Sequence, residues 1–461
     1  MKTRIIIVLA LCAFLQACGE EFLNVRADIA TTIPTSIQDY QALLDQGIMI
    51  SNSSRLFALA GGEEFTVSSG IWHGLPVVAN LRQFKNAYIW ADEIYLGDQG
   101  MDWNNAYQRI LQANLVLDGI SNLSPKNEPE TNLLNNVKGS ALFYRALNFY
   151  QLSQLFCKPY DGRSAEQDLG LPLRLEADVT LTSRRATLRQ TYDRILTDLL
   201  EAERLLPDFP SVKTRPSRVA TLALLARVSL VMGDFSKGSD YAKRALALNN
   251  VLIDYNSLQL DKPYPFPTGY GQSNEEVLFF SYAPTVPLMA NSVLEVNQEL
   301  LDIYEDDDLR KMLFYGNGSS GNVFFRGSYY GSSLFFVGLS TSEVVLIKTE
   351  CDIRMGLLDE ARELLDVLRG KRYKLGKLTN TPEIDAAGLL RFVLDERRRE
   401  LAFRGLRWDD LRRLNSDPEL SHTISREIDG VNYELKPKDT KYTWPIPDDV
   451  IQLSGMEQNK R

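Results

Sequence analysis

Residues 217–250 constrain the fold of this 461-residue chain more than any other stretch, because they have the pattern of two joined helices. Within 219–230, small and apolar residues recur at i, i+4, i+7 and i+11, which predicts a helix with a buried face. Gly233 suits the left-handed conformation that often follows a helix end, and Asp234 suits the N-cap of a new helix. In the second helix, close approach of a partner is allowed by the spaced small residues Gly238, Ala242 and Ala245.

This hairpin resembles one unit of a tetratricopeptide (TPR) repeat, and a single unit cannot bury its own apolar faces. Further helices are indicated at 36–45, 103–118, 133–156, 187–206, 342–372 and 386–414. Two blocks without a sustained period, 61–100 and 251–340, interrupt them, and the tail beyond 429 is predicted to be extended. We therefore expect a mainly α fold. A TPR-like helical-hairpin scaffold at about 103–250 and 341–428 would carry an irregular, loop-rich binding face at about 50–102 and 251–340, with a few short strands.

The first 17 residues have the three parts of a lipoprotein signal peptide. Lys2 and Arg4 are basic, residues 5–15 are apolar, and the small residue Ala17 precedes Cys18. We expect residues 1–17 to be removed and Cys18 to carry lipid, so that residues 18–461 form one anchored domain. An ordinary secretory signal cut elsewhere is the alternative. No other stretch reaches transmembrane length, so the mature chain is predicted to be anchored and not to span.

Composition excludes several classes of protein. With 44% hydrophobic and 24% charged residues the chain is typical of globular domains. Its formal net charge of −9 disfavours binding to nucleic-acid phosphates, and with only two His a His-based metal site is not expected. Cys157 and Cys351 lie in apolar helical patterns and are predicted to be buried thiols.

The carboxylates form no recognisable catalytic arrangement. Glu396 and Glu400 share a helix face beside arginines, which is typical of an interhelical ion-pair network or a solvated face. Glycoside hydrolysis needs two carboxylates on opposite sides of one bond, and neighbours in sequence do not establish that geometry. Residues 306–308, three Asp, have the chemistry for a structural calcium, but the alternating ligands of a calcium loop are absent. We expect no catalysis and no cofactor.

Short segments along nearly the whole chain share a pattern with one known family. In chain order they are Cys18 with 22–25 (Phe-Leu-Asn-Val), 113–117, 143–150, 156–160, 170–173, 187–195, 217–248, 274–276, 396–403, 405–413, 444–447 (Trp-Pro-Ile-Pro) and 458–459. With this ordered set the chain resembles the SusD/RagB-like family of outer-membrane nutrient-binding lipoproteins, of the starch-utilisation-system type. Arg404 departs from the pattern, which has Glu before the Gly, and this puts a local ion pair in question.

The resemblance implies a function as well as a fold. It implies an outer-membrane, lipid-anchored protein facing the cell exterior, which captures a nutrient oligomer, most simply an oligosaccharide or other glycan. The ligand would pass to a SusC-like TonB-dependent transporter. Peptide capture of the RagB type is the alternative within the family. Two alternatives come from other classes of protein. A surface glycosidase would turn over its glycan, and a TPR adaptor would bind only protein and ignore glycans.

Aromatic side chains in the two irregular blocks are the candidates for ligand contact. Sugar rings have apolar C–H faces and polar rims, which match flat aromatic rings flanked by polar groups. The candidates are Trp72, Tyr88, Trp90, Tyr95, Tyr264, Tyr270, Tyr282, Tyr329 and Tyr330. For each one the alternative is a place in the core, because blocks of this size must bury aromatic residues to fold.

Overall fold

The structure is a computed structural model that describes residues 34–51, 53–318 and 321–461. The predicted signal peptide and Cys18 lie outside the described residues. No helix within the described ranges combines the length and the apolar character needed to cross a membrane.

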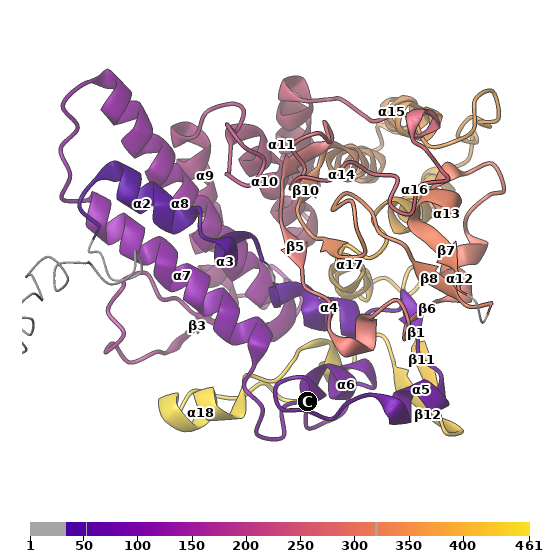
Figure 1. The fold of residues 1–461 in the computed structure, drawn as a ribbon, viewed down its shortest axis with the longest axis horizontal. Coiled ribbons are helices and arrows are strands. Elements are labelled where there is room, and N and C mark those ends of the chain that lie inside the picture. The colour runs from indigo at the N-terminus through magenta and orange to yellow at the C-terminus, as the bar shows by residue number, and fades with distance from the viewer. Residues whose placement is uncertain (1–33, 52, 319–320) are drawn as a thin grey trace, which may run out of the picture.

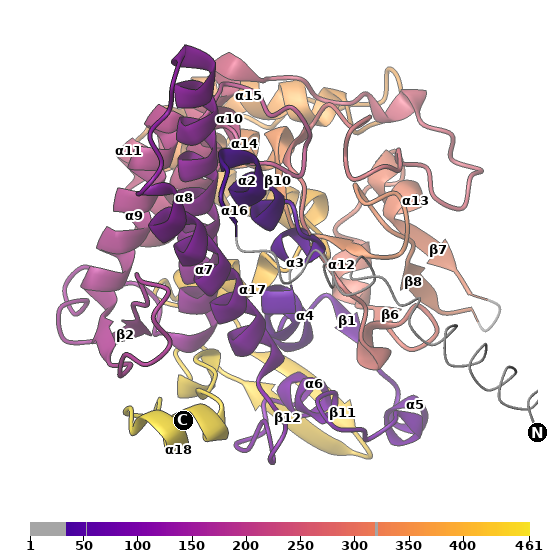
Figure 2. The ribbon, with the colours of Figure 1, turned by 60° about the vertical axis from the view of Figure 1, so that its left-hand side comes forward.

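Helices packed side by side form the scaffold (Figure 1). Successive helices from α7 to α11 contact one another, and α11 in turn packs on α14. Figure 2 shows the long helices α7 and α8 beside α9 and α10. The scaffold helices are α7 (Met101–Ile120), α8 (Glu128–Phe156), α9 (Leu188–Leu205), α10 (Arg218–Met232), α11 (Phe235–Leu248), α14 (Thr341–Arg354), α15 (Leu358–Gly370), α16 (Ala386–Glu400) and α17 (Arg407–Leu414).

The hairpin of α10 and α11 forms as its sequence predicts. Ser217 caps α10, Gly233 ends it with φ of 74°, and the Asp234 side chain accepts a hydrogen bond from the Lys237 amide to start α11. A Cβ on Gly238 would lie only 2.8 Å from Cys351 Sγ of α14. Small residues on this face therefore let α11 approach α14 closely.

Shorter elements fill the remaining segments. The other α-helices are α2 (Ile37–Leu44), α3 (Gly47–Ile50), α4 (Leu56–Gly61), α5 (Ser69–Gly74), α6 (Arg82–Tyr88), α12 (Gln298–Asp302), α13 (Leu309–Phe314) and α18 (Asp448–Ser454). The 3-10 turns are η4 (Ser53–Arg55), η5 (Tyr255–Ser257), η6 (Pro287–Met289) and η7 (Thr440–Tyr442).

Strands occur as two-stranded antiparallel pairs. The pairs are β1 (Phe65–Thr66) with β6 (Glu295–Val296), β2 (Leu169–Pro172) with β3 (Arg185–Thr187), β4 (Val277–Phe279) with β10 (Leu339–Ser340), β5 (Tyr282–Ala283) with β9 (Phe335–Phe336), β7 (Tyr315–Asn317) with β8 (Val323–Phe325), and β11 (Ile424–Ile428) with β12 (Val431–Leu435). The mainly α class with a few short strands is thus confirmed.

The structure divides two segments that the sequence pattern joined. The predicted helix at 342–372 breaks between α14 and α15, where Gly356 has φ of 84°. The predicted helix at 386–414 breaks between α16 and α17, where Phe403 and Gly405 both have positive φ. A helical period continues across a short break when both helices face the same core, so periodicity alone does not reveal it.

The tail beyond 429 is not simply extended, because it contains β12 and α18. Its 444–447 turn lies in the core: Trp444 stacks on Trp408 with ring centroids 5.1 Å apart. A Cβ on Gly61 would lie within 2.8 Å of both indole rings, so a glycine is needed where α4 meets them. Cys157 and Cys351 are buried and free, as predicted.

Candidate functional site

The four aromatic candidates of the first block lie in the core. Trp72 is 8% exposed, and Tyr88, Trp90 and Tyr95 are each 1% exposed. The Trp90 indole donates a hydrogen bond to the Gly61 carbonyl at 3.1 Å. These rings therefore form no open platform in the structure.

Tyr88 and Tyr95 are also fixed by internal hydrogen bonds. The Val67 amide donates to the Tyr88 hydroxyl at 2.9 Å, and the Tyr95 hydroxyl donates to the Pro445 carbonyl at 2.9 Å. The Arg426 guanidinium lies 3.8 Å from the centre of the Tyr88 ring. Such partners are those of structural aromatic residues.

Tyr329 and Tyr264, both in the second irregular block, differ strongly in solvent exposure. Tyr329 is fully buried, and its hydroxyl donates to Glu276 at 2.5 Å while the Arg404 guanidinium lies 4.3 Å from its ring centre. Tyr264 is 44% exposed and makes no ring contact with the other described aromatic residues. Arg404 stands where the family pattern has Glu. In the structure this arginine is buried and packs on the ring of Tyr329.

The remaining three candidates come together, and we call Tyr270, Tyr282 and Tyr330 the tyrosine cluster. Their rings surround buried Phe280: the centroid of Phe280 lies 5.5 Å from that of Tyr270 and 5.7 Å from that of Tyr330. The rings of Tyr282 and Tyr330 are themselves 5.1 Å apart, inclined at 59°. Tyr270 is 53% exposed and the other two are partly exposed. The cluster is an aromatic surface with a buried ring as its floor.

Local turns hold the cluster together. Gly269, Tyr270 and Gly271 all have positive φ, a conformation that glycine adopts freely and that aims Tyr270 outward from a tight turn. A Cβ on Gly271 would lie 3.1 Å from the Phe280 ring, so glycine permits this approach. Tyr282 is fixed by pairing of β5 with β9.

A second close contact places Tyr330. The next residue, Gly331, has φ of 74°, and a Cβ there would lie 2.7 Å from the Pro267 carbonyl oxygen. The loops carrying Tyr270 and Tyr330 therefore touch backbone to backbone. Sequence reasoning selected all three tyrosines but did not find Phe280, whose only local signal is the strand-like pattern in which it lies.

The tyrosine cluster is polar at its hydroxyl groups but carries no charge. Within the part of the chain that the structure describes, the three hydroxyls make no hydrogen bond. Burial raises the pKa of Tyr330, and the phenols of Tyr282 and Tyr270 add to the rise. The cluster can therefore offer apolar ring faces and free hydroxyls to a ligand.

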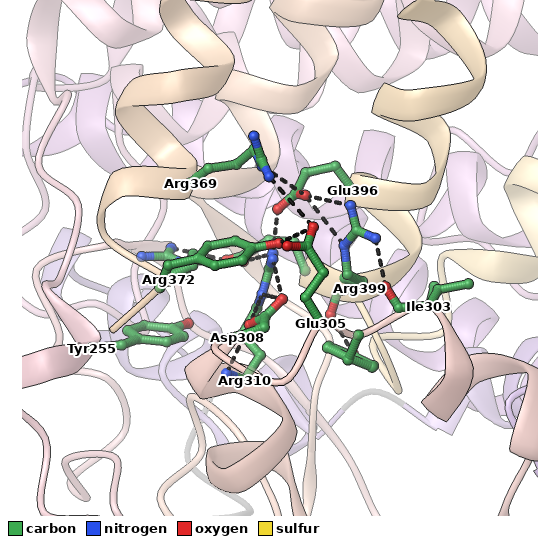
Figure 3. A network of polar contacts seen from close by, with 12 residues as sticks. Tyr255, Ile303, Glu305, Asp308, Arg310, Arg369, Arg372, Glu396 and Arg399 are labelled. Atoms are coloured by element: carbon green, nitrogen blue, oxygen red, sulfur yellow. Dashed lines mark hydrogen bonds and ion pairs between the residues drawn. The ribbon is translucent and has the colours of Figure 1, made fainter. Parts of the chain in front are cut away.

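The carboxylates that suggested chemistry form a buried ion-pair network (Figure 3). Arg310, fully buried, contacts Asp308 at 2.7 Å, Glu396 at 2.6 Å and Glu400 at 3.0 Å. Burial alone would raise the pKa of Glu396, but Arg310 and Arg399 hold it at about 2. A carboxylate kept ionised inside the protein and enclosed by arginines is a structural group, as the pattern of residues 396–400 predicts.

Two of the three Asp residues considered for calcium, Asp307 and Asp308, have other partners. Asp308 pairs with Arg310 and caps α13, and Asp307 pairs with Lys374 at 3.0 Å. Their oxygens are thus engaged with cations of the protein.

Comparison with known proteins places this chain among relatives along most of its length. A family profile described as "Starch-binding associating with outer membrane" matches residues 21–230, and the profile of the SusD family matches residues 336–461. The SusD-like protein P2 of Formosa agariphila is 27% identical, with 77% of this chain and 79% of that protein covered.

Solved structures share the fold. A SusD superfamily protein from Bacteroides thetaiotaomicron has a TM-score of 0.74 at 20% identity, covering 92% of this chain and 100% of that one. A putative sugar binding protein from Bacteroides vulgatus has a TM-score of 0.71 at 22% identity, covering 93% and 99%.

Together the TPR-like scaffold, the loop-borne face and these relatives define a nutrient-binding protein of the SusD type. Proteins of this kind are associated with the outer membrane and are binding proteins rather than enzymes. The chain belongs to the SusD/RagB-like family.

Proposed function

We propose that this protein captures a neutral oligosaccharide at the tyrosine cluster. The observation that carries the proposal is the meeting of three partly exposed tyrosines whose hydroxyls have no partner among the described residues. Flat rings cover the C–H faces of a sugar, and phenolic hydroxyls both donate to and accept from its hydroxyl groups. The inclined rings of Tyr282 and Tyr330 suit a chain of sugars that curves over the surface.

The absence of charge at the cluster favours a neutral ligand. The face of an aromatic ring carries negative potential, so an anion placed on it is repelled. An anionic sugar would also lose part of its hydration there without gaining a cation from the cluster, whose side chains are three tyrosines around Phe280.

Delivery of the ligand to a SusC-like TonB-dependent transporter is the second part of the proposal. Its support is membership of the family, whose matching profile is described as associating with the outer membrane. Lipid on Cys18 would hold the binding face at the cell exterior, where such a transporter opens.

Substitution of the cluster tests the site. Tyr282→Ala and Tyr330→Ala should each weaken binding of a neutral oligosaccharide, chosen from a glycan array, by about ten-fold, since a lost stacking contact costs about 1–1.5 kcal/mol. Calorimetry measures the affinity, and thermal melts show whether the fold survives. Tyr264→Ala is the matched control, because this exposed tyrosine of the same block lies outside the cluster.

Other results would redirect the proposal. Peptides bound on a parallel array, with glycans ignored, would favour RagB-type capture. Cleavage of a bound glycan would indicate a surface glycosidase, and binding of proteins alone would indicate an adaptor. Equal affinity of wild type and both cluster variants would remove the tyrosine cluster from the site.

A further inference from the structure

A cavity of about 960 Å³ lies away from the tyrosine cluster and shares no residue with it. It is lined by residues 158–161, 163 and 167–169, which lead from α8 into β2, by the ends of α10 and α17, and by the C-terminal residues 457–460. Figure 2 shows β2 and the C-terminus on the same lower side of the molecule. Its volume is in the range of small-molecule sites, about 300–1,000 Å³.

The lining of the cavity is rich in cations although the chain as a whole carries a net charge of −9. The basic side chains are Lys158, Arg163, Arg354, Arg412, Arg413, Lys438 and Lys460, and the acidic ones are Asp161, Asp168, Asp417, Asp439 and Glu457.

Ion pairs within the protein neutralise four of these cations. Lys158 pairs with Asp168 and Arg163 with Asp161, while Arg354 and Arg413 both contact Glu350. Arg412, Lys438 and Lys460 have no carboxylate within ion-pair distance in the described ranges. Asp417 and Asp439 each accept a hydrogen bond from a backbone amide but, like Glu457, have no cation within ion-pair distance in the described ranges.

Arg412 is the buried cation of the cavity. Its side chain is 2% exposed, and its Nη2 donates to the Cys157 carbonyl. Its Nε and Nη1 have no hydrogen-bond partner in the part of the chain that the structure describes. A buried donor without a partner costs about 1–3 kcal/mol, so native proteins satisfy most of them. The planar fork of a guanidinium matches the two oxygens of a carboxylate.

Asn415 adds a second unsatisfied group one turn further along. It is 4% exposed and lines the same cavity, and both polar atoms of its amide lack a partner among the described residues. The Tyr442 hydroxyl lies beside this amide: burial raises the pKa of Tyr442, and its side-chain contact with Asn415 offsets part of the rise. An amide that both donates and accepts matches a hydroxyl group of a ligand.

We propose that this cavity is a second ligand site, which binds a hydroxylated carboxylate, as in a uronic acid unit. Arg412 takes the carboxylate with a small turn of its side chain, Asn415 takes an adjacent hydroxyl, and Lys438 and Lys460 attract the anion at the rim. The site is separate from the neutral-sugar site of the tyrosine cluster and does not depend on it.

Calorimetry on the full mature chain with digalacturonate tests the proposal, with its neutral methyl ester as the matched ligand. Digalacturonate should bind at least about ten-fold more tightly than the ester, because only the acid pairs with the guanidinium. Arg412→Lys, which keeps the charge but loses the planar fork, should weaken binding by about ten-fold. The double variant Lys438→Gln/Lys460→Gln should weaken it by about two- to ten-fold.

Control variants locate the binding. Lys436 is on the same loop as Lys438 but does not line the cavity, and Tyr282 belongs to the tyrosine cluster. The variants Lys436→Gln and Tyr282→Ala should therefore bind digalacturonate with the affinity of wild type. Citrate, a hydroxylated carboxylate without a sugar ring, tests whether the natural ligand is a free hydroxy acid or an acidic sugar. If citrate binds as tightly, the site serves free hydroxy acids; if it binds weakly, the site serves acidic sugars.

The proposal would be overturned by no binding of digalacturonate at millimolar concentration, by equal binding of the ester, or by loss of binding in Tyr282→Ala. Unchanged affinity in the lysine double variant would do so as well. That variant changes exposed side chains only, so it decides the question even if Arg412→Lys fails to fold.

Discussion

Glu63 and Glu64 are neighbours in sequence with opposite electrostatic environments. Glu63 Oε1 contacts Arg407 at 2.6 Å, and Oε2 lies 2.6 Å from His422. Burial opposes ionisation of Glu63, but Arg407 and its other partners hold its pKa well below the usual range. Burial raises the pKa of Glu64 to about 7, since its main partner is the Phe403 amide, 2.5 Å from Oε1.

These shifts predict opposite effects of two amide substitutions. Glu64 binds a proton more tightly in the folded state, so its contribution to stability is present below pH 4.5 and is lost as pH rises through about 7. Glu64→Gln removes this loss, so its melting temperature relative to wild type should increase from pH 5 to pH 8. The change corresponds to about 2–3 kcal/mol.

Glu63→Gln is the matched comparison. Its carboxylate is stabilising above the unfolded pKa of about 4.5 and loses that effect only as pH falls through its depressed folded pKa. This variant should therefore be less stable than wild type at pH 5 and at pH 8. A constant difference between Glu64→Gln and wild type across this range would contradict the assignment of a raised pKa to Glu64.

Single residues also show why the aromatic candidates could not be sorted from sequence. Trp90 and Tyr270 both lie in irregular blocks, yet Trp90 is 1% exposed and Tyr270 is 53% exposed. Trp90 is covered by Gly61 and Arg426, and the position of Arg426 depends on the distant β11–β12 pair. Burial of such residues is set by long-range contacts, which local pattern does not report.

At the scale of elements, the sequence predicts those helices whose caps and packing residues lie within one short segment. The α10–α11 hairpin is recovered because its caps and small residues are written within one segment. Pairing of β4 with β10, or of β5 with β9, joins segments more than fifty residues apart, and strands of two or three residues carry almost no periodic signal. The tyrosine cluster depends on such a pair, so its assembly was not predictable.

Two alanines of α11 test the packing of the hairpin. Ala242 is fully buried and Ala247 is exposed, on the same helix. Ala242→Phe should destabilise the protein by about 1–3 kcal/mol relative to Ala247→Phe, because only the first forces a ring into a filled interface. Because both variants replace Ala by Phe on the same helix, the difference in denaturant midpoints reports mainly the packing around Ala242. Equal stability of the two variants would count against close helix packing here.

At the scale of the whole molecule, buried charges tie the loop-rich face to the scaffold. Arg372, which follows α15, contacts Glu400 of α16 at 2.9 Å and Glu276, just before β4, at 2.8 Å. Glu276 also accepts the hydroxyl of Tyr329, the residue next to Tyr330. The network therefore extends from the helices to the base of the tyrosine cluster.

Removal of Arg372 should expose this dependence. Arg372→Met leaves two carboxylates buried without their main partner, and breaking such a pair costs about 3–5 kcal/mol. Arg391→Met is the control, because Arg391 and Glu419 are exposed and such pairs contribute about 0–1 kcal/mol. Chemical unfolding compares the two. A loss in Arg372→Met no greater than in the control would mean that the network does not hold the face to the scaffold.

We propose that lipid on Cys18 attaches the whole molecule to the membrane. Lipid on this residue would add several buried acyl chains, each methylene contributing about 0.8 kcal/mol, enough to hold the domain on a bilayer. Cys18→Ala should therefore leave a folded protein in the soluble fraction, with unchanged melting temperature and unchanged affinity for the oligosaccharide, while wild type partitions into detergent. Cells lacking the transporter serve as the host, so that a protein partner cannot retain the variant. Membrane retention of Cys18→Ala equal to that of wild type in this host would reject the lipid anchor without touching the binding site.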